Sequence, residues 1–239
     1  MTITADDLTV VVPTRNESAN IGRFPASLPD ELRLIVIDSS TDDTPDRIVH
    51  LRPARTTVVQ AEANIPQARQ LGADLAATPW ILFTDADVAM DGGYLDGLRA
   101  VPVTGEVGGI VGVKDTAGGH EGYHRWFKRG QRLLHWVSIP AASGSNMLVR
   151  TDVLRAVGGF DPVLTVNEDT ELMFRIRRAG FRVPFAADVA VKAFDHRRLA
   201  AGRLRKWLHS LIRGAVLLAA PGSRWVRRSD WVYWRRLAH

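Results

Sequence analysis

Four short apolar runs, separated by helix-compatible stretches, constrain the fold more than any other feature of the sequence. The runs are LTVVVP (8–13), LRLIVID (32–38), TTVVQA (56–61) and WILFTD (80–85). Each is nearly continuous in apolar residues, as is typical of strands that are buried on both faces of a sheet. Short strands that alternate with helices form βαβ units with parallel strands. The sequence therefore predicts an α/β fold with a mostly parallel, Rossmann-like central sheet flanked by helices.

The second half of the chain is less regular. Residues 108–114 and 146–150 are typical of strands, and residues 151–160 and 167–183 are typical of helices that stop at glycine. There is no internal repeat and no low-complexity linker. We therefore expect one compact domain followed by a helical C-terminal tail.

The composition excludes several kinds of chemistry. The chain has no cysteine, so it forms no disulfide, uses no thiolate nucleophile and binds no zinc through cysteine. Its N-terminus lacks a basic region followed by an apolar run, and no apolar stretch reaches the roughly 18 residues of a membrane-spanning helix. We therefore expect a cytoplasmic protein, with any membrane contact peripheral and on the inner face of the cell membrane.

Charge is distributed unevenly along the chain. Residues 196–239 contain eleven lysines and arginines against one acid, so they carry +10, whereas residues 1–195 carry −5. Four of the seven tryptophans also lie in this basic segment. Residues 203–220 can form an amphipathic helix, and tryptophan and arginine suit the headgroup region of a membrane. Residues 203–239 thus indicate contact with an anionic membrane surface, and the alternative is a helical cap with solvated arginines. No segment resembles a base-reading module, so we expect no nucleic-acid partner.

The run WILFTD ends in Asp85, and a second aspartate, Asp87, follows two residues later. In an extended chain, residues i and i+2 project to the same side, so both carboxylates can face one point beyond the strand. Mg²⁺ and Mn²⁺ suit such a pair, because they take oxygen ligands and Mg²⁺ needs only one or two carboxylates beside water and phosphate. The alternative is a polar turn after a strand, where aspartate is common.

Two further acidic clusters carry candidate functional residues. Asp38 ends the second apolar run, where it can accept hydrogen bonds from a base or a ribose, although the polar residues after it also suit a turn. Glu168, Asp169 and Glu171 lie at the start of the predicted helix 167–183. Acids in a first helical turn stabilise the helix through its dipole, but three within four residues also favour a functional carboxylate.

Six motifs, taken in order, resemble the family 2 glycosyltransferases, which have the GT-A fold. They are VPTRNES (12–18), IDSSTDDT (37–44), NIPQARQLGADLAATPWILFTDAD (64–87), GSNMLVR (144–150), GGFDP (158–162) and NEDTEL (167–172). The resemblance implies transfer of a sugar from a nucleotide diphosphate donor with inversion at the anomeric carbon. It also implies a catalytic domain over residues 1–200, with a nucleotide-binding half at 1–90 and an acceptor half at 91–200, before the tail at 201–239.

The resemblance implies roles for residues around the donor. It places four residues of the first two loops around the nucleotide: Pro13, Thr14, Glu17 and Asp38. It places Arg69 near the diphosphate or the base. Ser39 stands where the family often has a second aspartate, so the identity of the base is open between UDP and GDP, with UDP favoured as the commoner choice.

The resemblance also implies a metal site and a catalytic pair. Asp85 and Asp87 match the residues that hold Mn²⁺ or Mg²⁺ on the donor diphosphate, and His196 matches a third ligand, although it could equally be a surface residue. Asp169 matches the general base that takes the proton of the acceptor hydroxyl, and Glu168 matches its supporting neighbour. With Asp169 opposite the leaving group, one displacement inverts the sugar and no covalent intermediate is required.

Together with the tail, the resemblance predicts a nucleotide-sugar donor and a glycan or lipid-linked acceptor at the membrane, as in cell-envelope glycan biosynthesis. Two alternatives stay open. The stretch FTDADVA partly resembles the start of an aspartate-nucleophile phosphatase, although Ala89 stands where that motif has Thr or Val and two βα units precede it. The other alternative is a non-catalytic nucleotide-binding module that docks on membranes.

Overall fold

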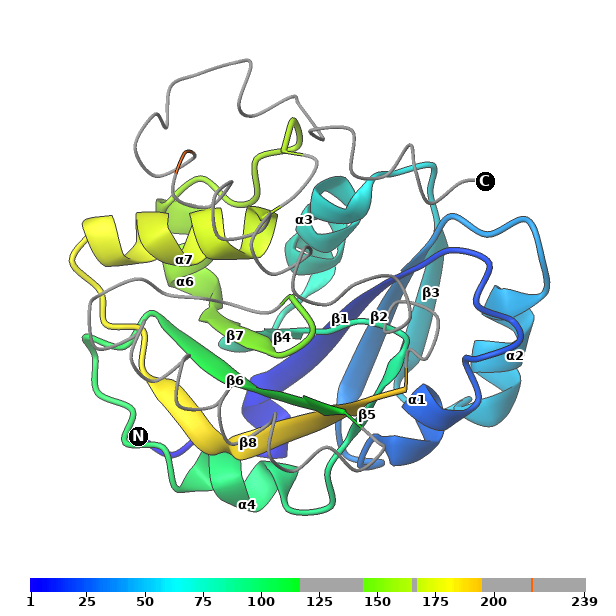
Figure 1. Cartoon of the computed structure of the whole chain (residues 1–239), viewed down its shortest axis with the longest axis horizontal. Coiled ribbons are helices and arrows are strands. Elements are labelled where there is room, and N and C mark those ends of the chain that lie inside the picture. Colours follow the sequence, from blue (N-terminus) through cyan, green and yellow to red (C-terminus); the bar gives the residue numbers. More distant parts are fainter. Residues whose placement is uncertain (117–143, 165–166, 195–215, 217–239) are drawn as a thin grey trace.

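A curled eight-stranded sheet organises the residues that the computed structural model describes, which are 1–116, 144–164, 167–194 and 216 (Figure 1). The strand order is β3-β2-β1-β4-β7-β6-β8-β5. The strands are β1 (Leu8–Thr14), β2 (Arg33–Asp38), β3 (Thr56–Gln60), β4 (Trp80–Phe83), β5 (Val88–Met90), β6 (Gly109–Thr116), β7 (Met147–Arg150) and β8 (Phe185–Ala193). The predicted α/β fold class is confirmed.

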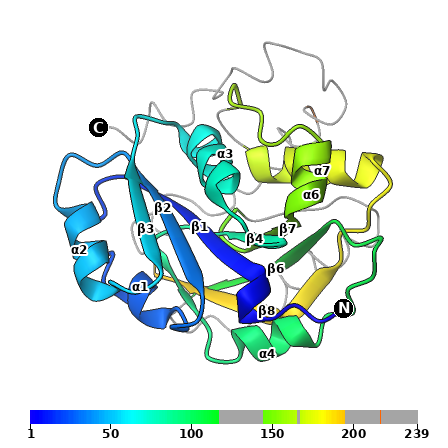
Figure 2. The ribbon, with the colours of Figure 1, turned by 180° about the vertical axis from the view of Figure 1, so that it is seen from behind.

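Helices cover both faces of this sheet (Figure 2). They are the 3-10 helix η1 (Ala5–Asp7), α1 (Arg23–Ser27), α2 (Thr44–Leu51), α3 (Ile65–Leu75), α4 (Tyr94–Arg99), α6 (Thr151–Ala156) and α7 (Glu168–Arg178). Val10 and Val12 of β1 pack in one core with α1, α2 and α4, whereas Val11 packs in a second core with α3, α6 and α7. This alternation along one strand is why the sheet needs a helical layer on each side.

The first four predicted strands pair in parallel as β3-β2-β1-β4. Each lies inside its predicted run, except that β1 extends one residue further, to Thr14. The prediction that all four are buried on both faces is wrong for β3, whose residues are partly buried or exposed. β3 is an edge strand: it pairs with β2 on one side, and its other side has no neighbouring strand in the described sheet.

The rest of the sheet is mixed. β7 runs antiparallel to β4 and β6, β6 runs parallel to β8, and β5 runs antiparallel to β8. The predicted strands 108–114 and 146–150 are found as β6 and β7, whereas β5, β8 and α4 were not predicted. β8 is rich in alanine and interrupted by Asp188 and Lys192, which gives it a weak strand signal. The helices predicted at 151–160 and 167–183 end earlier, before Gly158 and Gly180, which have positive φ angles.

The pairing register brings polar chain segments to one edge of the sheet, which we call the C-terminal edge. β1 and β2 end there together, because Thr14 pairs with Asp38. β4 ends at the same edge, and β7 begins there because it runs the opposite way, with Met147 paired to Phe83. Residues 144–146 therefore lie beside the chain that follows β4, although about 60 residues separate the two in sequence.

Within the described ranges, no helix is both long enough and apolar enough to cross a bilayer. The tail helix predicted over 203–220 lies outside the described residues, apart from Val216, which packs against the buried Leu164. The membrane contact predicted for the tail stays a prediction.

Candidate active site

Asp85 lies at the C-terminal edge, two residues beyond the end of β4. Its Oδ1 accepts a hydrogen bond from Arg69 Nη2 at 3.1 Å, and its Oδ2 accepts one from the Ser145 hydroxyl. Lys114 Nζ lies 3.8 Å from the same Oδ2 and donates to Ser145 Oγ at 2.7 Å. The Asp85 side chain is 31% exposed. Among the described residues, Arg69, Lys114 and Ser145 thus surround a carboxylate that stays partly exposed.

Arg69 reaches Asp85 from α3, and the local sequence explains where this helix begins. Asn64 Oδ1 accepts a hydrogen bond from the Gln67 N–H at 2.9 Å, and Gln67 Oε1 accepts one from the Asn64 N–H at 3.0 Å. This reciprocal capping box, with Pro66 in the first turn, fixes the start of α3. Arg69 therefore has a defined place on the buried face of the helix.

Arg69 connects two of the acidic clusters found in the sequence. It donates to Glu168 Oε1 at 2.6 Å through Nη1, and through Nη2 to Asp85 and to the carbonyl oxygen of Gly144, both at 3.1 Å. The residue is only 2% exposed. Burial alone lowers the pKa of Arg69, but the carboxylates of Glu168, Asp85 and Asp169 raise it, so the guanidinium stays charged. A Cβ at position 144 would lie 2.4 Å from Arg69 Nη2, which explains the glycine there.

Asp169 lies in the first turn of α7, next to Glu168. Its Oδ2 accepts a hydrogen bond from the Gly144 N–H at 2.6 Å, and its Oδ1 accepts one from the Thr170 N–H at 2.6 Å. Burial and the charge of Glu168 raise the pKa of Asp169 to about 6, although Arg69 and the two N–H groups lower it. A carboxylate with a pKa near neutral is chemically suited to accept a proton from a hydroxyl.

Glu171, the third acid of this cluster, serves the helix itself. Its carboxylate accepts a hydrogen bond from Arg175 Nε at 2.9 Å. Arg175 also donates to the carbonyl oxygens of Val157 and Gly159, both at 2.6 Å. This pair therefore fastens α7 to the turn that follows α6, and so fixes the helix that carries Asp169.

Thr14 and Asp38 form a second polar cluster at the C-terminal edge. The Thr14 hydroxyl donates to Asp38 Oδ1 at 2.5 Å. Ser40 donates to Asp38 twice, from its hydroxyl to Oδ1 at 2.7 Å and from its N–H to Oδ2 at 3.0 Å. Asp38 is only 1% exposed, and these three hydrogen bonds hold its buried carboxylate. The bonds from Ser40 also fix the loop after β2.

The loop after β1 is fastened to the loop after β2. The Asn16 N–H donates to Ser40 Oγ at 2.8 Å, and the Glu17 N–H donates to Thr44 Oγ1 at 2.9 Å. Pro13 is partly buried near the end of β1. The structure therefore brings together the four residues predicted around the nucleotide: Pro13, Thr14, Glu17 and Asp38.

The predicted metal ligands are only partly described. Asp87 lies two residues beyond Asp85, is partly buried, and its carbonyl oxygen accepts a hydrogen bond from the Phe194 N–H at 3.0 Å. His196 lies outside the described residues. In the part of the chain that the structure describes, no group of three His, Cys, Asp or Glu side chains is arranged to hold a metal ion. The assignment of Asp85, Asp87 and His196 as metal ligands stays a prediction.

Three residues of this site were not predicted individually from the sequence: Lys114, Gly144 and Ser145. Gly144 and Ser145 belong to the motif GSNMLVR, and the next residue of that motif, Asn146, is fully buried. The Asn146 amide donates to carbonyl oxygens of β6 and β8 at 2.9 Å, which fixes the segment against both strands. The only sequence signal for Lys114 is a lone lysine at the end of an apolar run.

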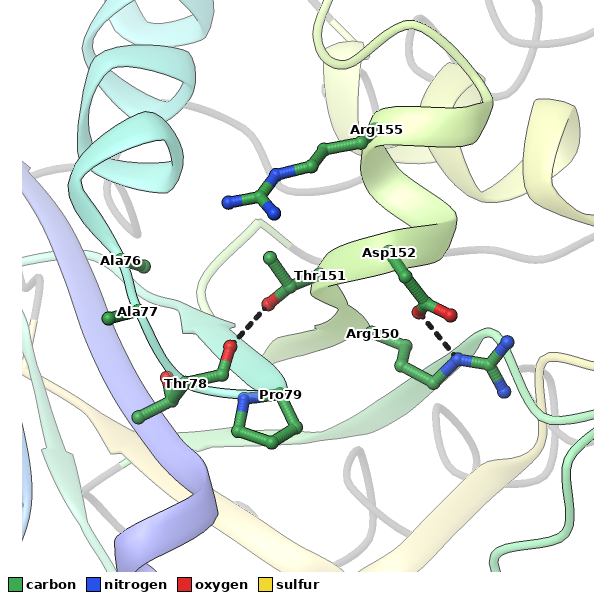
Figure 3. Close-up of a pocket in the computed structure, with 8 residues that line it drawn as sticks. All are labelled: Ala76, Ala77, Thr78, Pro79, Arg150, Thr151, Asp152 and Arg155. Atoms are coloured by element: carbon green, nitrogen blue, oxygen red, sulfur yellow. Dashed lines mark hydrogen bonds and ion pairs between the residues drawn. The ribbon is translucent and has the colours of Figure 1, made fainter.

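A pocket of about 350 Å³ lies at the opposite edge of the sheet (Figure 3). Its lining residues come from the chain between α3 and β4, from the end of β7 and from α6: Ala76, Ala77, Thr78, Pro79, Arg150, Thr151, Asp152 and Arg155. The Thr151 hydroxyl donates to the Thr78 carbonyl oxygen at 2.7 Å across it. Because β4 begins here and Asp85 follows its other end, this pocket is separate from the predicted site.

Comparison with known proteins identifies the family to which this arrangement belongs. The family model for glycosyl transferase family 2 matches residues 9–158, which is more than half of the chain. The chain belongs to glycosyl transferase family 2. The family predicted from the six motifs is therefore confirmed, and the aspartate-nucleophile phosphatase is set aside.

One curated relative of this family 2 glycosyltransferase matches most of the chain. The pre-mycofactocin glycosyltransferase of Mycobacterium tuberculosis is 28% identical over 215 residues, which cover 84% of this chain and 44% of the relative. The chain thus spans less than half the length of this curated relative.

Two solved structures confirm the predicted GT-A fold. The mannosyltransferase PcManGT from Pyrobaculum calidifontis, in complex with GDP-Man and Mn²⁺, has a TM-score of 0.74 at 23% identity, covering 93% of this chain and 67% of that one. Residues 1–349 of Staphylococcus aureus TarS, in complex with UDP-GlcNAc, have a TM-score of 0.65 at 19% identity, covering 88% and 66%.

Proposed function

We propose that this protein transfers a sugar from a nucleotide diphosphate donor to an acceptor hydroxyl, with inversion at the anomeric carbon. The observation that carries the proposal is the Arg69 bridge, in which one buried guanidinium binds Asp85 at 3.1 Å and Glu168 at 2.6 Å. The bridge holds Asp85, proposed to lie beside the donor, at a fixed distance from Glu168 and Asp169, proposed to lie beside the acceptor. Direct displacement depends on such fixed spacing between the reacting groups.

The donor is proposed to lie along the C-terminal edge, with its base near Thr14 and Asp38 and its diphosphate near Asp85. Ligands of open α/β sheets bind beyond the carboxyl ends of the strands, which supports this placement. PcManGT and TarS bind GDP-Man and UDP-GlcNAc, so both donor classes are candidates here, and UDP stays the first choice. Ser39, which stands where the family often has a second aspartate, donates its hydroxyl proton to the Ala61 carbonyl oxygen at 2.7 Å. That proton is therefore already used in a hydrogen bond within the protein.

A divalent cation, Mn²⁺ or Mg²⁺, is proposed at the diphosphate. Asp85 and Asp87 would hold it, with His196 as a third ligand, and two carboxylates at the end of one strand suit a hard cation that also binds phosphate oxygens. When bound, the ion would neutralise charge on the leaving diphosphate. The PcManGT complex contains Mn²⁺, which supports this choice of metal.

Asp169 is proposed as the general base and Glu168 as its supporting neighbour. The acceptor oxygen attacks the anomeric carbon, the bond from that carbon to the phosphate oxygen breaks, and the acceptor proton passes to Asp169. With a pKa of about 6, Asp169 is largely ionised at pH 7 and is a stronger base than an ordinary aspartate. The hydrogen bond from Gly144 holds one carboxylate oxygen in place for this step.

The acceptor is proposed to be a glycan or a lipid-linked molecule at the inner face of the cell membrane, reached through the basic tail. On this proposal residues 1–200 form the catalytic domain and residues 201–239 form the tail. The charge of +10 on residues 196–239 supports attraction to anionic lipid.

Vesicle binding tests the proposed membrane contact. Because Val216 packs on Leu164, we choose a triple serine variant of Arg224, Arg227 and Arg228, which leaves that contact intact. Each arginine near an anionic surface contributes about 1 kcal/mol, so binding to phosphatidylserine vesicles should weaken about 100-fold. Binding equal to that of the wild type would contradict the membrane role of the tail.

A thermal-shift panel of UDP, GDP, CDP and dTDP, each with and without Mn²⁺, tests the donor site. A ligand that binds only the folded state stabilises it by about 2.7 kcal/mol at one hundred times its Kd, which corresponds to about 5–10 °C for a chain of this size. We expect one nucleotide to stabilise the protein in the presence of Mn²⁺. The effect should disappear in Asp87→Ala and persist in the control Asp91→Ala, whose side chain pairs with Lys192. No response from a folded protein would favour the non-catalytic alternative.

A further inference from the structure

Lys114 is a second cation beside Asp85 that the proposed function does not use. It lies near the end of β6, which reaches the C-terminal edge because it runs antiparallel to β7. Its Nζ lies 3.8 Å from Asp85 Oδ2 and donates to Ser145 Oγ at 2.7 Å. The Ser145 hydroxyl donates to the same Asp85 oxygen, so three residues form one connected group.

The two cations beside Asp85 differ in their capacity to bind a ligand. Arg69 is 2% exposed, and both of its terminal nitrogens are used within the protein. The Lys114 side chain is 26% exposed. An ammonium has three N–H donors, and the hydrogen bond to Ser145 uses one of them. Lys114 can therefore donate to a ligand oxygen while the buried network stays intact.

The position of Lys114 also indicates which part of the ligand it meets. Ser145, its hydrogen-bond acceptor, directly follows Gly144, whose N–H donates to Asp169 at 2.6 Å. Lys114 thus lies at the junction between Asp85 and the proposed general base. In a bound nucleotide sugar, the phosphate nearest the general base Asp169 is the β-phosphate, because the sugar that is attacked is attached to that phosphate.

We propose that Lys114 donates a hydrogen bond to the β-phosphate of the donor and stabilises the negative charge that develops there as the sugar leaves. The inference rests on the proposed function, because it needs a nucleotide diphosphate at Asp85. A lysine acts on phosphate as a compact point charge, and a cation fixed where charge develops lowers the barrier to reaction. A phosphate on a lipid-linked acceptor has the same chemistry, but the contact of Lys114 with Asp85 favours the donor.

Nucleotide binding separates a β-phosphate contact from a structural role. We would use calorimetry to measure the Kd of the nucleoside diphosphate that stabilises the wild-type chain, and of its monophosphate, each with Mn²⁺ and with EDTA. The variants are Lys114→Met, which keeps the apolar stem without the charge, and Lys114→Arg, which keeps the charge. Lys114→Met should weaken diphosphate binding about 10- to 100-fold and monophosphate binding less than about threefold. Lys114→Arg should keep most of the affinity.

Lys192→Met is the matched control. Lys192 lies on β8, is 50% exposed, and pairs with Asp91 at 3.0 Å. Its replacement should leave both affinities unchanged. The melting temperature of each variant, measured without ligand, shows whether Lys114→Met folds. If it does not, Lys114→Gln removes the charge but keeps a side chain that can donate to Ser145, and the same selective loss of diphosphate affinity is expected.

Each other outcome overturns the inference. Equal weakening of diphosphate and monophosphate binding would show a structural role, and unchanged binding of both would show that Lys114 touches neither. A rise in the KM of the acceptor alone, with donor binding unchanged, would assign the contact to an acceptor phosphate. A wild-type chain that binds no nucleotide would instead contradict the proposed function itself, which distinguishes the two failures.

Discussion

Replacing Arg69 by methionine removes a side chain that bridges Asp85 and Glu168. Arg69 is 2% exposed and its guanidinium makes three hydrogen bonds of 2.6–3.1 Å, so its loss leaves two carboxylates without their common partner. Removing one member of a buried ion pair costs about 3–5 kcal/mol. Because Asp85 is 31% exposed and Glu168 12% exposed, water can partly solvate them, and the lower end of this range applies.

A loss of about 3 kcal/mol lowers the melting temperature of a chain of this size by about 6–12 °C, which circular dichroism measures easily. Arg69→Lys should lie between the two proteins, because a single ammonium cannot bind both carboxylates with the same geometry. The control is Arg99→Met, which removes an exposed ion pair with Asp96 and should shift the melting temperature by no more than about 2 °C. An Arg69→Met protein that melts within about 2 °C of the wild type would contradict the claim that Arg69 stabilises the fold by joining Asp85 to Glu168.

Three further predictions follow from the same contacts. Burial and the charge of Glu168 raise the pKa of Asp169 to about 6, and a general base acts only when it is deprotonated. In a pH-rate profile, kcat/KM should therefore rise as the pH increases through about 6 and then level off. Glu168→Gln removes the neighbouring charge, so it should move this rise in kcat/KM to lower pH. Gly144→Ala places a Cβ 2.4 Å from an Arg69 nitrogen that Glu168 and Asp85 hold in place, so urea unfolding should show a loss of about 1–3 kcal/mol, and a stability equal to that of the wild type would contradict the close approach. Tyr94→Phe removes the hydroxyl that donates to buried Asn146 Oδ1 at 2.8 Å, which should also cost about 1–3 kcal/mol in the same assay, and no measurable cost would show that the bond is not needed.

The parallel half of the sheet could be predicted because its signals are local. Each of its strands is a short apolar run that is followed by polar residues. Because parallel strands end at the same edge, the ends of these runs already imply that Asp38 and Asp85 lie at one edge of the sheet. β8 could not be predicted in this way. It is rich in alanine and is stabilised as a strand by pairing with β6 and β5, which lie far away in the sequence.

The candidate site shows the same division. The acids at positions 85 and 168–169 were found from their positions in recognisable motifs. Their connection through Arg69 was not, because it joins side chains 99 and 16 residues apart and depends on how α3 and α7 pack. Lys114 could not be predicted for a similar reason: the pairing of β6 with β7 brings it to Ser145.

Turnover of the donor by Asp169→Asn, measured beside nucleotide binding by the same protein, tests the central claim most directly. Asparagine keeps the size of the side chain and can still accept the hydrogen bond from the Gly144 N–H, but it cannot take a proton from the acceptor. We predict that sugar transfer falls by at least about 100-fold while stabilisation by nucleotide and Mn²⁺ stays as in the wild type. Transfer at the wild-type rate would contradict the assignment of Asp169 as the general base and, with it, the proposed mechanism.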